Sequence, residues 1–130
     1  MSRDCDEVIA AGRLKKANQF LGSARDVGEL ADDEADVRDA VVTLLVHAGI
    51  AAADAICCRA LGRYSLGSDN HEEAVSLLRK VRQPDGAQLA KHLTRLLGMK
   101  TKAGYAHRPV TAKERIQAER AASELVDAAR

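Results

Sequence analysis

Aromatic residues are scarce in this 130-residue chain: they make up 2% of it, with one Phe, two Tyr and no Trp. A surface that stacks the bases of single-stranded nucleic acid on several aromatic rings is therefore not expected. The core must instead come from Ala, Leu, Val and Ile, which favours closely packed helices. Apolar residues reach 46%, as in a folded chain. At this length we expect one domain spanning residues 1–130.

Cysteine is also sparse, and Cys5, Cys57 and Cys58 do not suggest a disulfide framework because their number is odd and two are adjacent. Neighbouring helical residues point about 100° apart, so Cys57 and Cys58 are poorly placed to grip one metal ion. We interpret the three as small buried residues in a reducing compartment, and we therefore expect a cytoplasmic protein.

Several other signals are missing. No run of about 18 uninterrupted apolar residues occurs, so no membrane span is expected. Asp4, Asp6 and Glu7 stand where a signal peptide would be basic, which argues against a targeting signal. The chain has no metal-binding His or Cys spacing, no Gly-rich phosphate loop and no nucleophile elbow. We accordingly expect neither a metal nor another cofactor.

The charges are unevenly distributed, although the net charge is only +1. Residues 1–78 hold 8 Lys/Arg against 14 Asp/Glu, a net charge of −6, whereas residues 79–120 hold 11 against 3, a net charge of +8. This asymmetry would suit an anionic partner on the C-terminal helices. It would equally suit self-association of acidic half on basic half, or a basic face that is merely solvated.

Hydrophobic periodicity predicts helices over residues 4–30, 33–61, 70–81, 85–105 and 112–129, with Val8 and Ile116 on inner faces. Small side chains at 48–53 would let another helix approach the second one closely. Capping boxes pair Asp69 with Glu72 and Thr111 with Glu114. The expected fold is all-α, a bundle of four to five helices that run mostly antiparallel because their connections are short.

The fourth predicted helix has an unusual stripe, in which Leu89, Leu93 and Leu96 are followed at the same spacing by Lys100, Ala103 and His107. If the helix continues that far, Lys100 and His107 share a face about 10 Å apart, with Thr101 and Tyr105 beside them. Histidine could transfer a proton and lysine could stabilise phosphate charge, which would suit metal-independent RNA cleavage. Alternatively, the helix ends near Gly104 and these groups are solvated.

Two further polar groups are interpreted as structural. His47 and Asp54 lie seven residues apart on the apolar second helix, where a satisfied polar pair, bonded directly or bridged by a partner helix, could fix helix register. His71 follows Asp69 at the start of the third helix, where hydrogen bonding around the helix end is the expected role.

Three segments together resemble the HEPN superfamily of small helical proteins. They are VHAGIAAADA at 46–55, GSDNHEEA at 67–74 and LLGMKTKAGYAH at 96–107. The family's ribonucleases carry an Arg, a polar residue and, a few positions later, a His. Here Lys100 and Thr101 occupy the first two positions and His107 the last, while Lys102 to His107 forms a second frame.

The resemblance implies a homodimer that binds RNA or a nucleotide through Lys100, Lys102, Tyr105 and His107. It also implies a degenerate metal-independent endoribonuclease of a toxin–antitoxin or defence system, in which His107 is the acid/base and Lys100 binds phosphate. Lysine stands where the family has arginine, so two other roles stay open. One is a non-enzymatic partner of a nucleotidyltransferase or antitoxin, and the other is a DNA-binding regulator.

Overall fold

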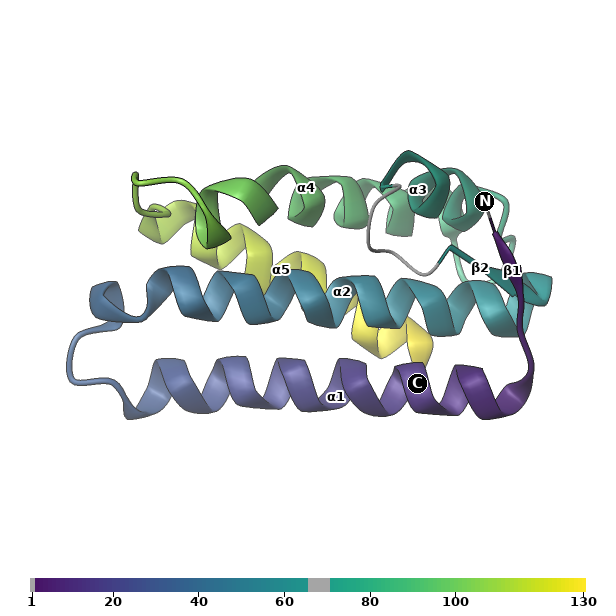
Figure 1. The fold of residues 1–130 in the computed structure, drawn as a ribbon, viewed down its shortest axis with the longest axis horizontal. Coiled ribbons are helices and arrows are strands. Elements are labelled where there is room, and N and C mark those ends of the chain that lie inside the picture. Colours follow the sequence, from purple (N-terminus) through teal and green to yellow (C-terminus); the bar gives the residue numbers. More distant parts are fainter. Residues whose placement is uncertain (1, 66–70) are drawn as a thin grey trace.

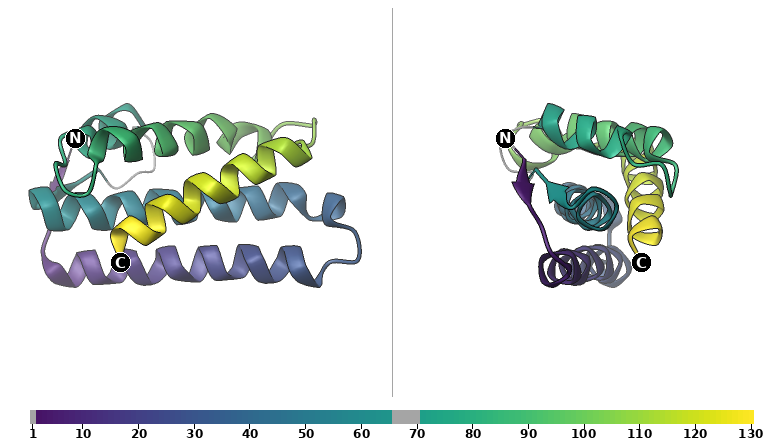
Figure 2. Two further views of the ribbon diagram at one scale, coloured as in Figure 1. Left: turned by 180° about the vertical axis from the view of Figure 1, so that it is seen from behind. Right: turned by 90° about the vertical axis from the view of Figure 1, so that its right-hand side faces the viewer.

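The protein, seen here in a computed structural model that describes residues 2–65 and 71–130, is an all-α bundle as predicted (Figure 1). Consecutive long helices run antiparallel, and α5 crosses the bundle obliquely (Figure 2). The helices in the described residues are α1 (Glu7–Leu30), α2 (Arg38–Leu61), α3 (His71–Arg79), α4 (Gly86–Gly104) and α5 (Ala112–Ala129).

Helix α2 is the centre of the bundle, with α1, α5 and the α3–α4 pair placed around it (Figure 2). Its length and apolar composition would suffice to cross a membrane, but 83% of its most apolar stretch is buried inside the bundle. At Gly49 an added Cβ would collide with the Leu96 side chain and lie 3.3 Å from Leu125 Cδ1. The small side chains of α2 therefore do allow α4 and α5 to approach closely, as expected.

Local capping explains where several helices begin. Asp85 accepts a hydrogen bond from the Gln88 backbone N–H at 3.2 Å and starts α4. The predicted capping box of Thr111 and Glu114 is present, and α5 has the predicted bounds. The predicted box of Asp69 with Glu72 lies outside the described residues.

The chain before α1 differs from the prediction. Asp6 caps α1, and the preceding residues form a short strand, β1 (Arg3–Asp4), rather than helix. This strand pairs antiparallel with β2 (Arg63–Tyr64), directly after α2. Helix α2 likewise begins later than predicted, after a 3-10 turn, η1 (Glu34–Asp36).

Two residues expected on inner faces are exposed: Val8 is 80% and Ile116 is 44% accessible. Each stands two positions before a buried alanine, Ala10 on α1 and Ala118 on α5. Two steps turn a helix by about 200°, so each side chain points to the opposite side from that alanine. The prediction for these two positions was wrong because the inner stripes are made mostly of alanine.

Candidate functional site

The end of α4 separates the two residues that the sequence stripe had placed together. The helix stops at Gly104, where the backbone N–H groups of Tyr105 and Ala106 both donate to the Thr101 carbonyl. The following segment then turns so that Val110 is fully buried, and its N–H donates to Asp39 at 2.7 Å. His107 is exposed and lies beyond the helix. The helix therefore does not continue far enough for Lys100 and His107 to share one face, and the alternative prediction that it ends near Gly104 is confirmed.

The other residues predicted near that stripe also take separate positions. Lys102 forms an ion pair with Glu114 at 2.7 Å, so its charge is already matched by the first turn of α5. Tyr105 is 83% exposed, and Thr101 is exposed on the outside of α4. None of these contacts joins Lys102, Tyr105 and Thr101 to Lys100.

Lys100 instead approaches a histidine from another helix. Its Nζ atom lies 3.5 Å from Nε2 of His71, the first residue of α3, and both side chains are half-buried. If Lys100 is the donor, His71 accepts through an unprotonated Nε2. The structure thus brings together two predicted residues that the sequence had assigned to unrelated roles.

His47 and Asp54 do not bond to each other, because each takes a partner from α1. Asp54 is 3% exposed and accepts from Arg13 at 2.9 Å, while the His47 ring is tilted against Phe20 with centroids 5.5 Å apart. The two partners on α1 are also seven residues apart, as antiparallel packing requires. The predicted pair within α2 is therefore replaced by two contacts between helices, and His47 itself is exposed.

Both α2 groups have shifted pKa values. Partial burial, together with the nearby charges of Lys100 and Arg13, lowers the pKa of His47 from its usual range. Burial raises the pKa of Asp54 to about 6, although the Arg13 guanidinium opposes this shift. His47 is therefore mainly neutral at pH 7 and can either accept or donate a hydrogen bond.

Figure 1 shows α2 lying between α1 and α4. His47 on α2 therefore contacts Phe20 of α1 and lies close enough to Lys100 of α4 to feel its charge. We call the set of Arg13, His47, His71 and Lys100 the cationic face. It draws one residue each from α1 to α4, which explains why no local sequence motif reveals it.

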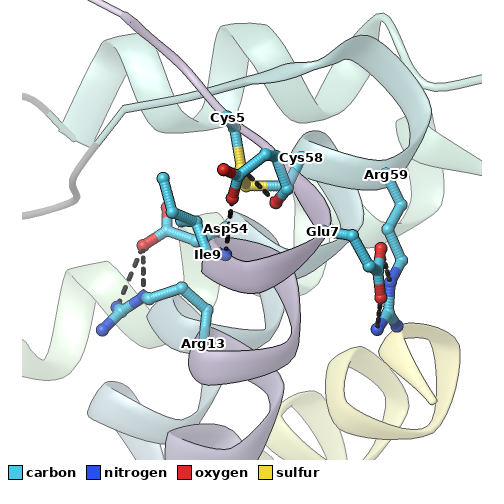
Figure 3. The surroundings of a disulfide bond; sticks show 8 residues. Cys5, Glu7, Ile9, Arg13, Asp54, Cys58 and Arg59 are labelled. Atoms are coloured by element: carbon cyan, nitrogen blue, oxygen red, sulfur yellow. Dashed lines mark hydrogen bonds and ion pairs between the residues drawn. A yellow bond between two sulfur atoms is a disulfide. The ribbon is translucent and has the colours of Figure 1, made fainter.

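The expectation that the cysteines are separate small residues is wrong for Cys5 and Cys58. Cys5 and Cys58 form a disulfide with their Cα atoms 5.4 Å apart, which ties the N-terminal segment to α2 (Figure 3). The ion pairs of Asp54 with Arg13 and of Glu7 with Arg59 lie on either side of it. These two cysteines, 53 residues apart in the sequence, meet because α2 folds back along α1. The spacing of cysteines in the sequence could not show that contact.

Cys57 is the remaining thiol. It is buried, and burial raises its pKa to about 12, followed by a smaller effect of the Asp54 charge. A thiol in this state is not nucleophilic at neutral pH, which fits the structural role expected for it.

Part of the charge asymmetry is used inside the chain. Arg115 of α5 pairs with Glu34 of η1 at 2.9 Å, and Glu119 of α5 pairs with Arg25 of α1 at 3.0 Å. The first pair joins the basic segment to the acidic one, so it matches part of the charge asymmetry within one molecule, whereas the second joins an acidic residue of 79–120 to a basic residue of 1–78.

A groove between α3 and α4 is a further feature that the sequence did not suggest. Its volume is about 520 Å³, and His71 lines it at the start of α3, next to Lys100. Its other lining residues include Val75, Ser76, Arg79, Thr94 and Leu97.

In residues 2–65 and 71–130, no three His, Cys, Asp or Glu side chains come together as a metal site would require. No protein-family model matches the sequence, and no curated protein matches it significantly.

Proposed function

We propose that this protein binds RNA or a nucleotide and that Lys100, His71 and His47 of the cationic face hold the phosphate. The observation that carries this proposal is the environment of Lys100. Its ammonium is half-buried beside the His71 imidazole, and within the described ranges no carboxylate lies at ion-pair distance from it.

In the described residues the other partly buried lysine and arginine side chains are matched by carboxylates: Arg13, Arg38, Lys102 and Arg115. Lys102, two residues away, has Glu114, and Arg13 has Asp54. A partly buried cation without such a partner leaves positive potential at the surface, and an anion would complete the site. A phosphate oxygen could accept hydrogen bonds from the Lys100 ammonium and from an imidazole N–H at once.

Binding of a labelled single-stranded RNA, followed by fluorescence anisotropy at low salt, tests this proposal. Lys100→Gln should weaken binding about tenfold or more, because a charge-assisted hydrogen bond contributes roughly 1.5–3 kcal/mol. The matched control is Lys91→Gln, which removes the same charge from an exposed position nine residues earlier on α4. Equal affinities for the two variants would refute a phosphate site at Lys100.

The resemblance-based assignment of Lys102 can be checked in the same assay. Since Glu114 already neutralises Lys102, Lys102→Gln should weaken RNA binding less than Lys100→Gln does. A larger loss in Lys102→Gln would instead favour the site that the HEPN resemblance implies.

The same face also carries the groups that metal-independent RNA cleavage needs. In that reaction a base takes the 2′-hydroxyl proton and the 2′-oxygen bonds to phosphorus. The bond from phosphorus to the 5′-oxygen then breaks while an acid protonates the leaving oxygen. His47 and His71 offer two imidazoles for these proton transfers, and Lys100 can stabilise the charge on phosphate.

Cleavage of single-stranded RNA in EDTA distinguishes this arrangement from the one based on His107. Loss of cleavage in His47→Ala and His71→Ala, with activity kept in His107→Ala, would favour the cationic face. The opposite pattern would favour His107 as acid/base. Binding without cleavage by the parent would identify a non-catalytic RNA-binding protein.

Failure of the parent protein to bind RNA or nucleotides would favour the remaining proposal, a non-enzymatic helical partner. Such a protein would form a homodimer or dock on a second chain such as a nucleotidyltransferase or antitoxin. Light scattering on the purified protein would establish the dimer directly.

A further inference from the structure

The groove between α3 and α4 has an apolar floor and a polar rim. Val75 is 9% exposed and Leu97 is partly buried against the core, so these two side chains form the floor. Ser76 and Thr94 are exposed on opposite helices at the rim. With a volume of about 520 Å³, the groove is within the usual range of small-molecule sites.

The two ends of the groove carry positive charge. Arg79, in the last turn of α3, lines one end, while His71 at the start of α3 leads to Lys100 at the other. The eight residue steps from His71 to Arg79 correspond to about 12 Å along the helix. A ligand lying in the groove would therefore contact an apolar floor along its length and reach the cationic face at one end.

We propose that this groove holds the base and ribose of a nucleotide whose phosphate lies at Lys100 and His71. This inference rests on the proposed function and names the part of the molecule that recognises the nucleoside.

The chemistry of the groove fits a nucleoside better than another phosphate-bearing group. The floor formed by Val75 and Leu97 would take one flat face of a base, and the Arg79 guanidinium can stack on the other. Thr94 donates its hydroxyl proton to the Ala90 carbonyl at 2.8 Å, so its oxygen remains an acceptor for a base N–H.

A carboxylate at the rim suits the ribose. Glu72 lines the groove one residue after His71, and its oxygens can accept hydrogen bonds from ribose hydroxyls.

Calorimetric titration with adenosine 5′-monophosphate and with ribose 5-phosphate tests the inference. The second compound has the phosphate and the sugar but no base. In the parent protein the nucleotide should bind at least tenfold more tightly than ribose 5-phosphate.

Thr94 is exposed and lies six residues before Lys100 on α4, so Thr94→Trp would fill the end of the groove assigned to the base and leave the His71 end, with Glu72, open to the ribose. The variant should remove this tenfold difference while ribose 5-phosphate still binds as before. Gln88→Trp is the matched control, because it places the same side chain at an exposed position of α4 outside the groove lining, and it should preserve the difference. Lys100→Gln should weaken both compounds equally.

The outcomes separate the groove from the phosphate site. If single-stranded RNA binds in a Lys100-dependent manner but the nucleotide has no advantage over ribose 5-phosphate, the groove assignment is overturned and the proposed function stands. An advantage that survives Thr94→Trp overturns it in the same way. If neither RNA nor any of the phosphate compounds binds the parent, both proposals fail together.

Discussion

The α1–α2 hairpin and the α3–α4 pair use charge in opposite ways. Along the hairpin, ionised side chains from the two helices face each other: Arg13 meets Asp54, and Glu7 meets Arg59. At the α3–α4 pair, Lys100 meets the imidazole of His71 instead of a carboxylate.

The difference separates the stabilising part of the molecule from the part available for binding. Matched ion pairs, a strand pair and a disulfide close the hairpin end, so little electrostatic potential is left there for a ligand. The α3–α4 pair keeps a half-buried cation and an open groove, features that contribute little to folding but suit an anionic ligand. Three predictions test this division, beginning with the largest effect.

The largest effect is expected at the Cys5–Cys58 disulfide. Cross-linking residues 53 positions apart restricts the unfolded chain and should stabilise the fold by about 4 kcal/mol. Urea unfolding of the oxidised parent and of Cys5→Ser measures this difference. A thiol reductant should lower the parent's stability toward that of Cys5→Ser and leave the variant unchanged, and equal stability of the two oxidised proteins would show that the disulfide contributes nothing.

The next effect is expected at Gly49, where α2 packs closely against Leu96 of α4 and Leu125 of α5. Gly49→Val should destabilise the protein by roughly 1–3 kcal/mol, because the new side chain would collide with Leu96 in a filled core. Gly98→Ala on α4 is the matched control. An added Cβ there meets no atom within 4 Å, so helix propensity should make the variant up to about 1 kcal/mol more stable. Thermal unfolding of both variants measures the contrast, and similar changes would mean that α2 and α4 do not pack this closely.

Sequence signals that act within a few residues predicted this structure well. The capping box of Thr111 with Glu114 located the start of α5, and Pro84 with its following Asp85 located the start of α4. The two-residue strands were missed because alternation cannot be recognised over so short a stretch. Whether the stripe through Lys100 continued to His107 or the helix ended near Gly104 stayed open, because periodicity alone does not show that the chain turns inward to bury Val110.

The candidate site was only partly predictable, since it depends on contacts between distant segments. Lys100, His71 and His47 were each noticed in the sequence, but their proximity follows from the packing of α3 and α4 on α2. For the same reason the sequence could not name the residue on the neighbouring helix that bonds to Asp54. The residue that bonds to it, Arg13, gave no signal because a basic side chain on a peripheral helix is usually solvated.

The smallest effect is expected at Asp54, and it tests the charge pairing within the α1–α2 hairpin. The pKa of Asp54 is about 6 in the folded state and 3.8 in the unfolded chain. Between about pH 4 and 6 the folded protein therefore keeps a proton on Asp54 that the unfolded chain has released. Asp54 therefore contributes stability that is fully present below about pH 4 and is lost as the pH rises to about 6. Asp54→Asn lacks this dependence, so the stability of the parent minus that of the variant should fall by on the order of 2 kcal/mol over this range.

Urea unfolding of both proteins at pH 4, 5, 6 and 7 measures the difference in their free energies of unfolding. Other carboxylates, such as Glu7 and Glu114 with their lowered pKa values, titrate in both proteins, so their contribution cancels in this difference. A difference that rises with pH would mean that Arg13 outweighs burial and holds the pKa of Asp54 low. RNA binding by Asp54→Asn at pH 7 provides the comparison with the other region. Because Asp54→Asn leaves the Arg13 guanidinium of the cationic face without its carboxylate, the variant should bind RNA at least as tightly as the parent even where its stability has changed.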